Sequence, residues 1–379
     1  MDPRLPTLLT APVSPRLVIE ATYLDVLVRD GLPAGTGFSI ALPRGWAVER
    51  TATAAPGPQA PIVPLARFHP GEPGATGAAE GVELVVWAAF LPREMHGADW
   101  LRAWMRSQGY RELDFRQAPS PTGMMGDALA AGRHNGALRL HRLLTVKDGD
   151  LLFLIDGRMI QGGMAQGGVA DHRVMQEIVL LAAMRFRLAE PTGQTFAEGF
   201  EWTELKGGTH AVRFLASGLW RETPGGDAPP DGASLVLDHV GPDGSTGRGS
   251  LIAVLGAAEA TAEAALAAAA EIERTTLAKL ANQGFALSAE ADLLAKERTA
   301  ERSLLLHRRK ARRSGPQGST PMTVLSARIA LAEAGGGEGV EAGQALPVCL
   351  ILLSPDEDTA FEAWAINRRA FEIALSTVR

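Results

Sequence analysis

The chain is 379 residues long, of which 46% are hydrophobic and 21% are charged, and its formal net charge is −6. This length predicts about two domains, and the composition excludes the disordered, collagen-like and disulfide-scaffold classes. The acidic balance argues against broad binding to nucleic acid or anionic membrane, while the single cysteine, Cys349, excludes a disulfide within the chain and a zinc site built from cysteines.

The first residues do not have the pattern of a secretion signal. Met1–Arg4 is followed by only a short apolar stretch, which Pro12 and Pro15 interrupt. The longest apolar runs, such as Val82–Phe90 and Leu251–Ala258, are much shorter than the about 18 residues of a membrane helix. We therefore expect a cytoplasmic protein, and the many alanines, glycines and arginines with few lysines are typical of a bacterium.

Residues 1–36 are expected to form an N-terminal extension, in which Val18–Val28 can add one strand. The first predicted domain covers residues 37–188. It opens on Phe38–Leu42, whose apolar residues alternate with small or polar ones as in a half-buried strand, and continues to Trp46. Its other strands and helices are expected at Val82–Phe90, Asp99–Gln108 (helix), Ala128–His134, Ala137–Val146, Leu151–Ile155 and Asp171–Met184 (helix), with a hairpin turn at Asn135-Gly136.

A linker is expected at residues 189–198, after which the same order returns in a second predicted domain, residues 199–379. Val212–Ala216 matches the first alternating segment and leads to Trp220. A Gln-Gly-aromatic triplet follows each tryptophan at nearly the same distance, where a helix C-terminus favours glycine. The other elements are expected at Ser250–Leu255, Thr261–Gln283 (helix), Ser303–Lys310, Met322–Leu331 and Leu346–Leu353, with a closing helix that Ser354, Pro355 and Glu357 begin.

Both halves predict the same α+β fold. Strands joined by hairpins, with helices between them, favour an antiparallel sheet on which helices pack. Val82–Phe90 is apolar on both faces except for Glu83, which is typical of a strand covered on both sides. We therefore expect two tandem helix–antiparallel sheet–helix sandwich domains that are related by internal duplication.

Four segments resemble the PsbP-like sandwich family: Phe38–Trp46, the mid-chain helix, the hairpin run Leu138–Ile155 and the terminal Met184–Arg187. The resemblance covers most of residues 37–188 and, more weakly, residues 210–379, where Ser217–Leu219 replaces the proline and glycine of the first copy. The family includes an extrinsic photosystem subunit, a Ran-binding nuclear import factor and the Eag-type bacterial chaperones of type VI secretion effectors. As a group, these chaperones shield apolar helices of effectors before export. They are usually single domains, so a fused tandem departs from their pattern.

The residue patterns of common enzymes and metal sites are absent from the sequence. It contains no Gly-Lys pair of a phosphate loop, no His-Glu-x-x-His and no Gly-x-Ser-x-Gly. The eight histidines are scattered, and Cys349 lies in an apolar segment where a buried, inert thiol is expected. We expect no catalytic residue, no bound metal and no cofactor, and therefore a protein that is not an enzyme.

One strand face of the first half mixes polar and apolar side chains. Arg139, His141 and Leu143 alternate with leucines that the core needs, so they point to the opposite face. Val85 and Trp87 join them there if the two strands pair in the matching register. These five residues, Val85, Trp87, Arg139, His141 and Leu143, are the predicted partner-binding groove. The alternative is that a helix covers this face and the charges lie at its edge.

A basic run at residues 307–313 is the strongest charge cluster in the sequence. Its cationic members are Arg308, Arg309, Lys310, Arg312 and Arg313. It could receive an acidic peptide or a phosphate, or it could be the solvated tip of a hairpin. No aromatic residues interleave it, so nucleic-acid binding is not expected.

These observations together predict a protein-binding adaptor or chaperone that is not an enzyme. Its partner would be an apolar helical segment, for instance of a secreted effector as in type VI secretion, and no membrane insertion is expected. The alternatives are a structural subunit that bridges partners in a larger bacterial assembly, and an enzyme with an unrecognised site.

Overall fold

The computed structural model describes residues 6–52, 54–71, 81–134, 137–160, 171–223, 228–241, 248–315, 318–332 and 344–379. The chain divides into two compact units, Met1–Glu198 and Gly199–Arg379. The described residues contain five helices and four sheets, and every strand pair in these sheets is antiparallel. The protein is therefore of the α+β class, as the hairpin-rich sequence predicts. The hairpin turn predicted at Asn135-Gly136 lies outside the described residues.

A seven-stranded sheet forms the centre of unit 1. Its strand order is β3-β4-β5-β9-β8-β7-β6. The order places β5, which is apolar on both faces, next to β9 in the middle of the sheet. The strands are β3 (Trp46–Arg50), β4 (Ile62–Pro70), β5 (Val82–Phe90), β6 (Arg111–Ser120), β7 (Gly123–His134), β8 (Ala137–Asp148) and β9 (Leu151–Ile160).

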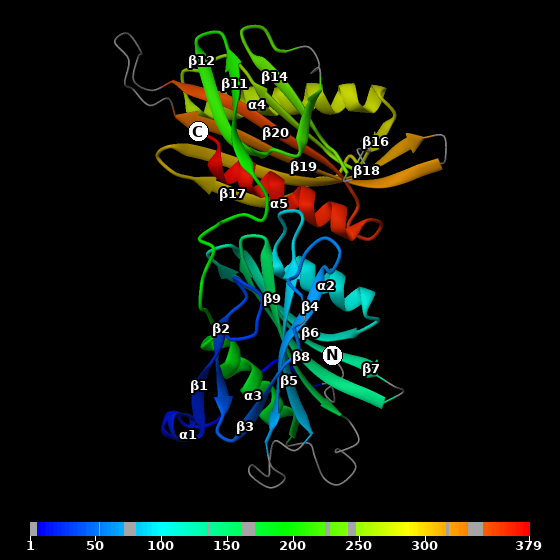
Figure 1. Ribbon diagram of the computed structural model, residues 1–379. Helices are drawn as coiled ribbons and strands as arrows, with labels where there is room; N and C mark the ends of the chain where they lie inside the picture. The colour runs from blue at the N-terminus through cyan, green and yellow to red at the C-terminus, as the bar shows by residue number, and fades with distance from the viewer. Residues whose placement is uncertain are drawn as a thin grey trace. The chain divides into compact units, whose positions relative to one another are not determined.

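The helices α2 (Gly97–Ser107) and α3 (Asp171–Met184) cover opposite faces of this sheet (Figure 1). On β5, Leu84 and Val86 belong to the larger core cluster with α3, whereas Trp87 packs in the smaller cluster with α2. This division follows from the period-two alternation of a strand. It explains why β5 carries apolar residues on both sides.

The N-terminal residues of unit 1 are tied to α3. The strand expected within Val18–Val28 is present in its second half as β1 (Tyr23–Val28), while the first half belongs to a short helix, α1 (Arg16–Thr22). β1 pairs with β2 (Phe38–Pro43), which also pairs with β10 (Arg187–Leu188) in a three-stranded sheet. Ahead of α1, the backbone of residues 7–14 exchanges hydrogen bonds with the side chains of Gln176 and Glu177 on α3.

A larger sheet forms the centre of unit 2. Its strand order is β13-β14-β15-β20-β19-β18-β16, and β17 pairs with β18 beside this path. A separate two-stranded sheet consists of β11 (Phe200–Gly207) and β12 (His210–Ser217). The strands of the large sheet are β13 (Trp220–Thr223), β14 (Ala233–His239), β15 (Ser250–Leu255), β16 (Phe285–Leu287), β17 (Asp292–Arg298), β18 (Arg302–Gly315), β19 (Gly318–Ala332) and β20 (Ala345–Pro355).

The two long helices of unit 2, α4 (Ala262–Asn282) and α5 (Phe361–Thr377), also cover opposite faces of their sheet (Figure 1). Leu350 and Leu352 of β20 pack in the cluster with α5, while Cys349 and Ile351 pack in the cluster with α4. The predicted helix Thr261–Gln283 is therefore correct to within one residue at each end, with Thr261 as its N-cap.

The start of the closing helix was predicted wrongly. Ser354 and Pro355 are the last residues of β20, not the cap and first turn of a helix, and α5 begins at Phe361. The ladder to β19 holds them in the strand, because Ser354 pairs with Thr323 and Pro355 with Met322. Sheet pairing over a long strand has thus overridden the local capping pattern.

Candidate binding site on unit 1

The face of the unit 1 sheet that carries Trp87 and Leu143 is covered in part by α2. Leu101 and Met105 of α2 pack on Leu143 and on neighbouring strand residues, with Trp87 beside them. The helix packs against β6, β7 and β8. The register prediction that places Trp87 and Leu143 on one side of the sheet is therefore confirmed, but a helix occupies much of that side.

This helix removes most of the predicted groove residues from solvent. Val85 and His141 are each only 2% exposed, and Leu143 is completely buried. Trp87 and Arg139 are half-buried. Val85, His141 and Leu143 are therefore too buried to form the surface of a groove as predicted; α2 packs over Leu143, and Tyr110 covers His141.

His141 lies in a buried polar contact. Its Nδ1 is 2.9 Å from Oδ1 of Asp156 on β9, and the ring of Tyr110 lies over it at a centroid distance of 4.6 Å. Burial, followed by the negative charge of Asp156, raises the pKa of Tyr110 to about 12, so its hydroxyl stays protonated at neutral pH. The His–Asp pair is thus buried beneath a neutral ring.

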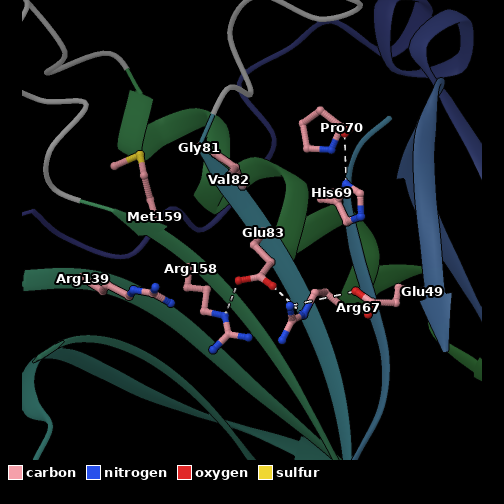
Figure 2. Close-up of a pocket in the computed structure, with 10 residues that line it drawn as sticks. All are labelled: Glu49, Arg67, His69, Pro70, Gly81, Val82, Glu83, Arg139, Arg158 and Met159. Atoms are coloured by element: carbon pink, nitrogen blue, oxygen red, sulfur yellow. Dashed lines mark hydrogen bonds and ion pairs between the residues drawn. The ribbon is translucent and has the colours of Figure 1, made fainter. Parts of the chain in front are cut away.

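Beyond the helix, the same face of the sheet opens into a charged pocket of about 370 Å³ (Figure 2). Figure 2 shows Glu83 of β5 between two arginines, one from each neighbouring strand. Its carboxylate lies 2.8 Å from Nε of Arg158 and 2.7 Å from Nε of Arg67. Arg67 also approaches Glu49 at 3.9 Å. The sheet therefore holds a line of alternating charges, each fixed by its strand.

Arg139 lines this pocket from β8 without an ion pair among the described residues. Its Nε is buried and has no hydrogen-bond partner there. The pocket thus contains three arginines, of which Glu83 and Glu49 engage two. Within the described ranges, no carboxylate pairs with Arg139.

Of the pocket's charged residues, only Arg139 was a predicted site residue. Glu83 was recognised in the sequence as the one charge on its strand, but Arg67 and Arg158 were missed. Arg158 lies past Ile155, where the predicted strand ended too early, since β9 continues to Ile160. The alternation along β4 and β9 predicts which face of the sheet Arg67 and Arg158 occupy. Only the register between the strands shows that both lie next to Glu83.

The basic run of unit 2 lies along β18, and its last residues, Arg312 and Arg313, are exposed near the end of the β18–β19 hairpin, whose strands meet at Gly315 and Gly318. Its residues alternate between the two faces of the sheet. Leu304 and Leu306 place Arg308, Lys310 and Arg312 on the face of α5, whereas Ala311 places Arg309 and Arg313 on the face of α4. The five predicted residues therefore do not share one surface.

Several members of the basic run already have partners. Arg308 lies 3.0 Å from Asp292, and Nε of Arg312 lies 3.0 Å from the hydroxyl of Ser319. Arg309 is 3.9 Å from Glu273, a buried carboxylate of α4 that also binds Arg328 at 2.5 Å. These contacts reduce the charge that the run presents to a ligand.

Across the described residues, no group of three or more His, Cys, Asp or Glu is placed to hold a metal ion. In the same part of the chain, no helix is long and apolar enough to cross a membrane. Cys349 is completely buried in β20, and burial raises the pKa of its thiol far above the usual range.

Comparison with known proteins gives no family, because no family model and no curated protein matches the chain. Weak similarities exist to solved structures. Cyanobacterial PsbP (CyanoP) from Synechocystis is 12% identical, with a TM-score of 0.31 over 44% of this chain and 93% of that chain. LpqN of Mycobacterium tuberculosis, involved in cell envelope biogenesis, is 10% identical, with a TM-score of 0.28 over 46% and 95%.

A third similarity extends over almost the whole chain. The immunity protein TplEi of the type VI secretion system of Pseudomonas aeruginosa, solved with a peptide, is 12% identical, with a TM-score of 0.18 over 94% of this chain and 98% of that chain. All these scores are too low to assign a family or a function. The function is therefore argued from the site itself.

Proposed function

We propose that this chain is a protein-binding adaptor, not an enzyme, and that unit 1 binds an acidic side chain of its partner in the pocket beside Glu83. The observation that carries this proposal is the guanidinium of Arg139, which lines the pocket without an ion pair in the described part of the chain, whereas Arg67 and Arg158 both pair with Glu83. A partner carboxylate would pair with this unmatched charge through charge-assisted hydrogen bonds.

The neighbouring charges support a carboxylate over a larger anion. Glu83 already neutralises the sides of Arg67 and Arg158 that face it, so the pocket has room for about one further negative charge. Arginine binds carboxylates in a planar, two-point geometry, which would give the contact its direction. A dense phosphate charge would instead have to compete with Glu83 for both arginines.

The buried polar pair supports the proposal that the protein is not an enzyme. His141 and Asp156 form a buried His–carboxylate pair on this face, and Tyr110 covers them. A general base must reach the proton that it removes, and this imidazole is only 2% exposed. The expected shielding of apolar helices is not favoured here, because charged side chains line the open pocket.

We further propose that the two units are copies of one fold. The match between their strand orders supports this idea: β3-β4-β5-β9-β8-β7-β6 in unit 1 and β13-β14-β15-β20-β19-β18-β16 in unit 2. In each order, the first three strands precede a helix and the fourth strand is followed by the closing helix. Experimental structures of both units, superposed strand by strand, would test the duplication.

The test of the binding proposal uses an acidic probe peptide, tetraglutamate with blocked ends, titrated into the full chain at low salt by calorimetry. Arg139→Gln should weaken its binding by about fivefold or more, because the variant loses the charge that Glu83 does not match. The matched control is Arg133→Gln on the neighbouring strand, where an exposed arginine opposes Leu138 on the other face of the sheet.

Equal weakening by Arg133→Gln and Arg139→Gln would mean that the peptide senses only the overall charge, and it would overturn the proposal. The same conclusion would follow if the peptide does not bind at all. A tetralysine peptide should show no measurable affinity for the pocket, since its charge has the wrong sign.

A further inference from the structure

A cavity of about 630 Å³ lies in unit 2, between α4 and its sheet. This is within the range of cavities that hold small organic ligands. The helix α4 packs mainly on β19 and β20, and it covers the neighbouring strands β14 and β15 less closely. The cavity lies between α4 and this part of the sheet.

The walls of the cavity are mostly apolar. Ile252 and Val254 of β15 and Val236 of β14 form the floor together with Leu353 of β20. Leu280 of α4 contributes to the opposite wall. These residues are branched or aliphatic and would contact an alkyl chain without leaving any hydrogen-bonding group unsatisfied.

One end of the cavity is cationic. Arg313 of β18 lies there with its guanidinium 5.6 Å from the centre of the Phe285 ring, and Lys279 of α4 lines the same cavity. Arg313 has no ion pair in the described part of the chain. An aromatic ring fixes the position of this cation without cancelling its charge.

Two carboxylates also line the cavity, and an arginine neutralises one of them. The other, Asp238, is hydrogen-bonded but keeps its negative charge. Glu271 accepts two hydrogen bonds from Arg274, at 2.8 and 2.5 Å, and these bonds lower its pKa. Asp238 accepts a hydrogen bond of 2.6 Å from the hydroxyl of Ser250. Neither carboxylate pairs with Arg313, so the arginine end of the cavity keeps its positive charge.

We propose that this cavity binds an amphipathic anion, namely a carboxylate with a medium-length alkyl body. The alkyl chain lies along Val236, Ile252 and Val254, and the carboxylate is bound by Arg313 with Lys279 nearby. Both halves of the ligand are needed: apolar area provides the affinity, and the arginine fixes the orientation. This site is independent of the unit 1 pocket and of the acidic partner proposed for it.

The experiment titrates dodecanoate into the full chain by calorimetry, and it compares Arg313→Gln with Arg312→Gln. The two arginines are adjacent on β18 but lie on opposite faces, and Arg312 contacts Ser319 instead of the cavity. Arg313→Gln should weaken dodecanoate binding about tenfold, and Arg312→Gln should leave it within about twofold.

Two further measurements separate the roles of the alkyl chain and the charge. Val236→Trp should abolish binding by filling the floor, and butyrate should bind far more weakly than dodecanoate because it buries less apolar area. Dodecyltrimethylammonium, with the same chain and the opposite charge, should bind the wild-type chain at least about tenfold more weakly than dodecanoate.

The proposal is overturned if dodecanoate does not bind at about 1 mM, or if both arginine variants weaken it equally. It is also overturned if the ammonium amphiphile binds as tightly as the carboxylate, since that result would mean unspecific hydrophobic adsorption. Circular dichroism of each variant identifies any loss of folding. If Val236→Trp does not fold, the comparison of the two arginines decides the outcome.

Discussion

The guanidinium of Arg142 is completely buried on the α3 face of the unit 1 sheet. It donates to both carboxylate oxygens of Asp127, at 3.1 and 2.8 Å, and to the backbone carbonyls of Gln176 and Leu9, at 2.8 and 2.9 Å. A buried charge is tolerable only when its partners replace water in this way. In the sequence, Arg142 alternates onto the same strand face as Leu140 and Leu144. Nothing in this pattern predicts the distant residues that bind its guanidinium.

Asp127→Asn should therefore lower the free energy of unfolding by about 3–5 kcal/mol, because it removes the counter-charge and leaves Arg142 buried. Urea unfolding monitored by tryptophan fluorescence measures this loss. Glu20→Gln is the control, since it breaks an ion pair with Arg16 on an exposed helix face and should leave the unfolding midpoint unchanged. If Asp127→Asn lowered the free energy of unfolding by less than about 1 kcal/mol, this account would be wrong, and water would have to reach the guanidinium of Arg142.

At the scale of elements, α3 approaches β9 closely at one residue. A Cβ atom added to Gly157 would lie only 2.0 Å from Cγ2 of Val179 on the helix. The helix can pack at this distance because glycine has no side chain, and the contact lies within the largest core cluster of unit 1.

Gly157→Ala should consequently destabilise the protein by about 1–3 kcal/mol, because the added methyl group overpacks the core. The double variant Gly157→Ala with Val179→Ala should be more stable than additivity of the two single changes predicts, since the second change removes the clashing atom. Denaturant unfolding of all four proteins gives the coupling free energy, and strict additivity would contradict this account of the contact.

Elements with a strong local pattern could be predicted from the sequence, and pairings between distant residues could not. The strands Val82–Phe90 and Ala137–Asp148 and the helix α4 were anticipated from periodicity almost to the residue. The start of α5 was missed because the ladder between β19 and β20 outweighs a capping pattern. The pocket was missed for a related reason: Arg67, Glu83 and Arg158 meet only through the register of three strands.

At the scale of the whole molecule, each unit has its own hydrophobic core, and only unit 2 contains a cysteine. A chain segment with its own core can fold alone. We expect residues 199–379, produced without unit 1, to fold and to protect Cys349 from a thiol reagent such as Ellman's reagent. The thiol should react only after denaturant is added, because it is buried and its pKa is raised. Rapid labelling of this fragment in buffer, but not of the full chain, would show that unit 2 depends on unit 1.

Residues 7–14 belong to the packing of unit 1 and are not a loose tail. The carbonyl of Leu9 accepts one of the hydrogen bonds of Arg142, and Ser14 donates through both its backbone and its hydroxyl to Glu177. A protease that removed this segment would deprive the buried guanidinium of Arg142 of one hydrogen-bond acceptor, and it would open a path for water beside α3. Limited digestion near the N-terminus should therefore be slow in the native protein and, once it occurs, should lead to rapid cleavage of the rest of unit 1.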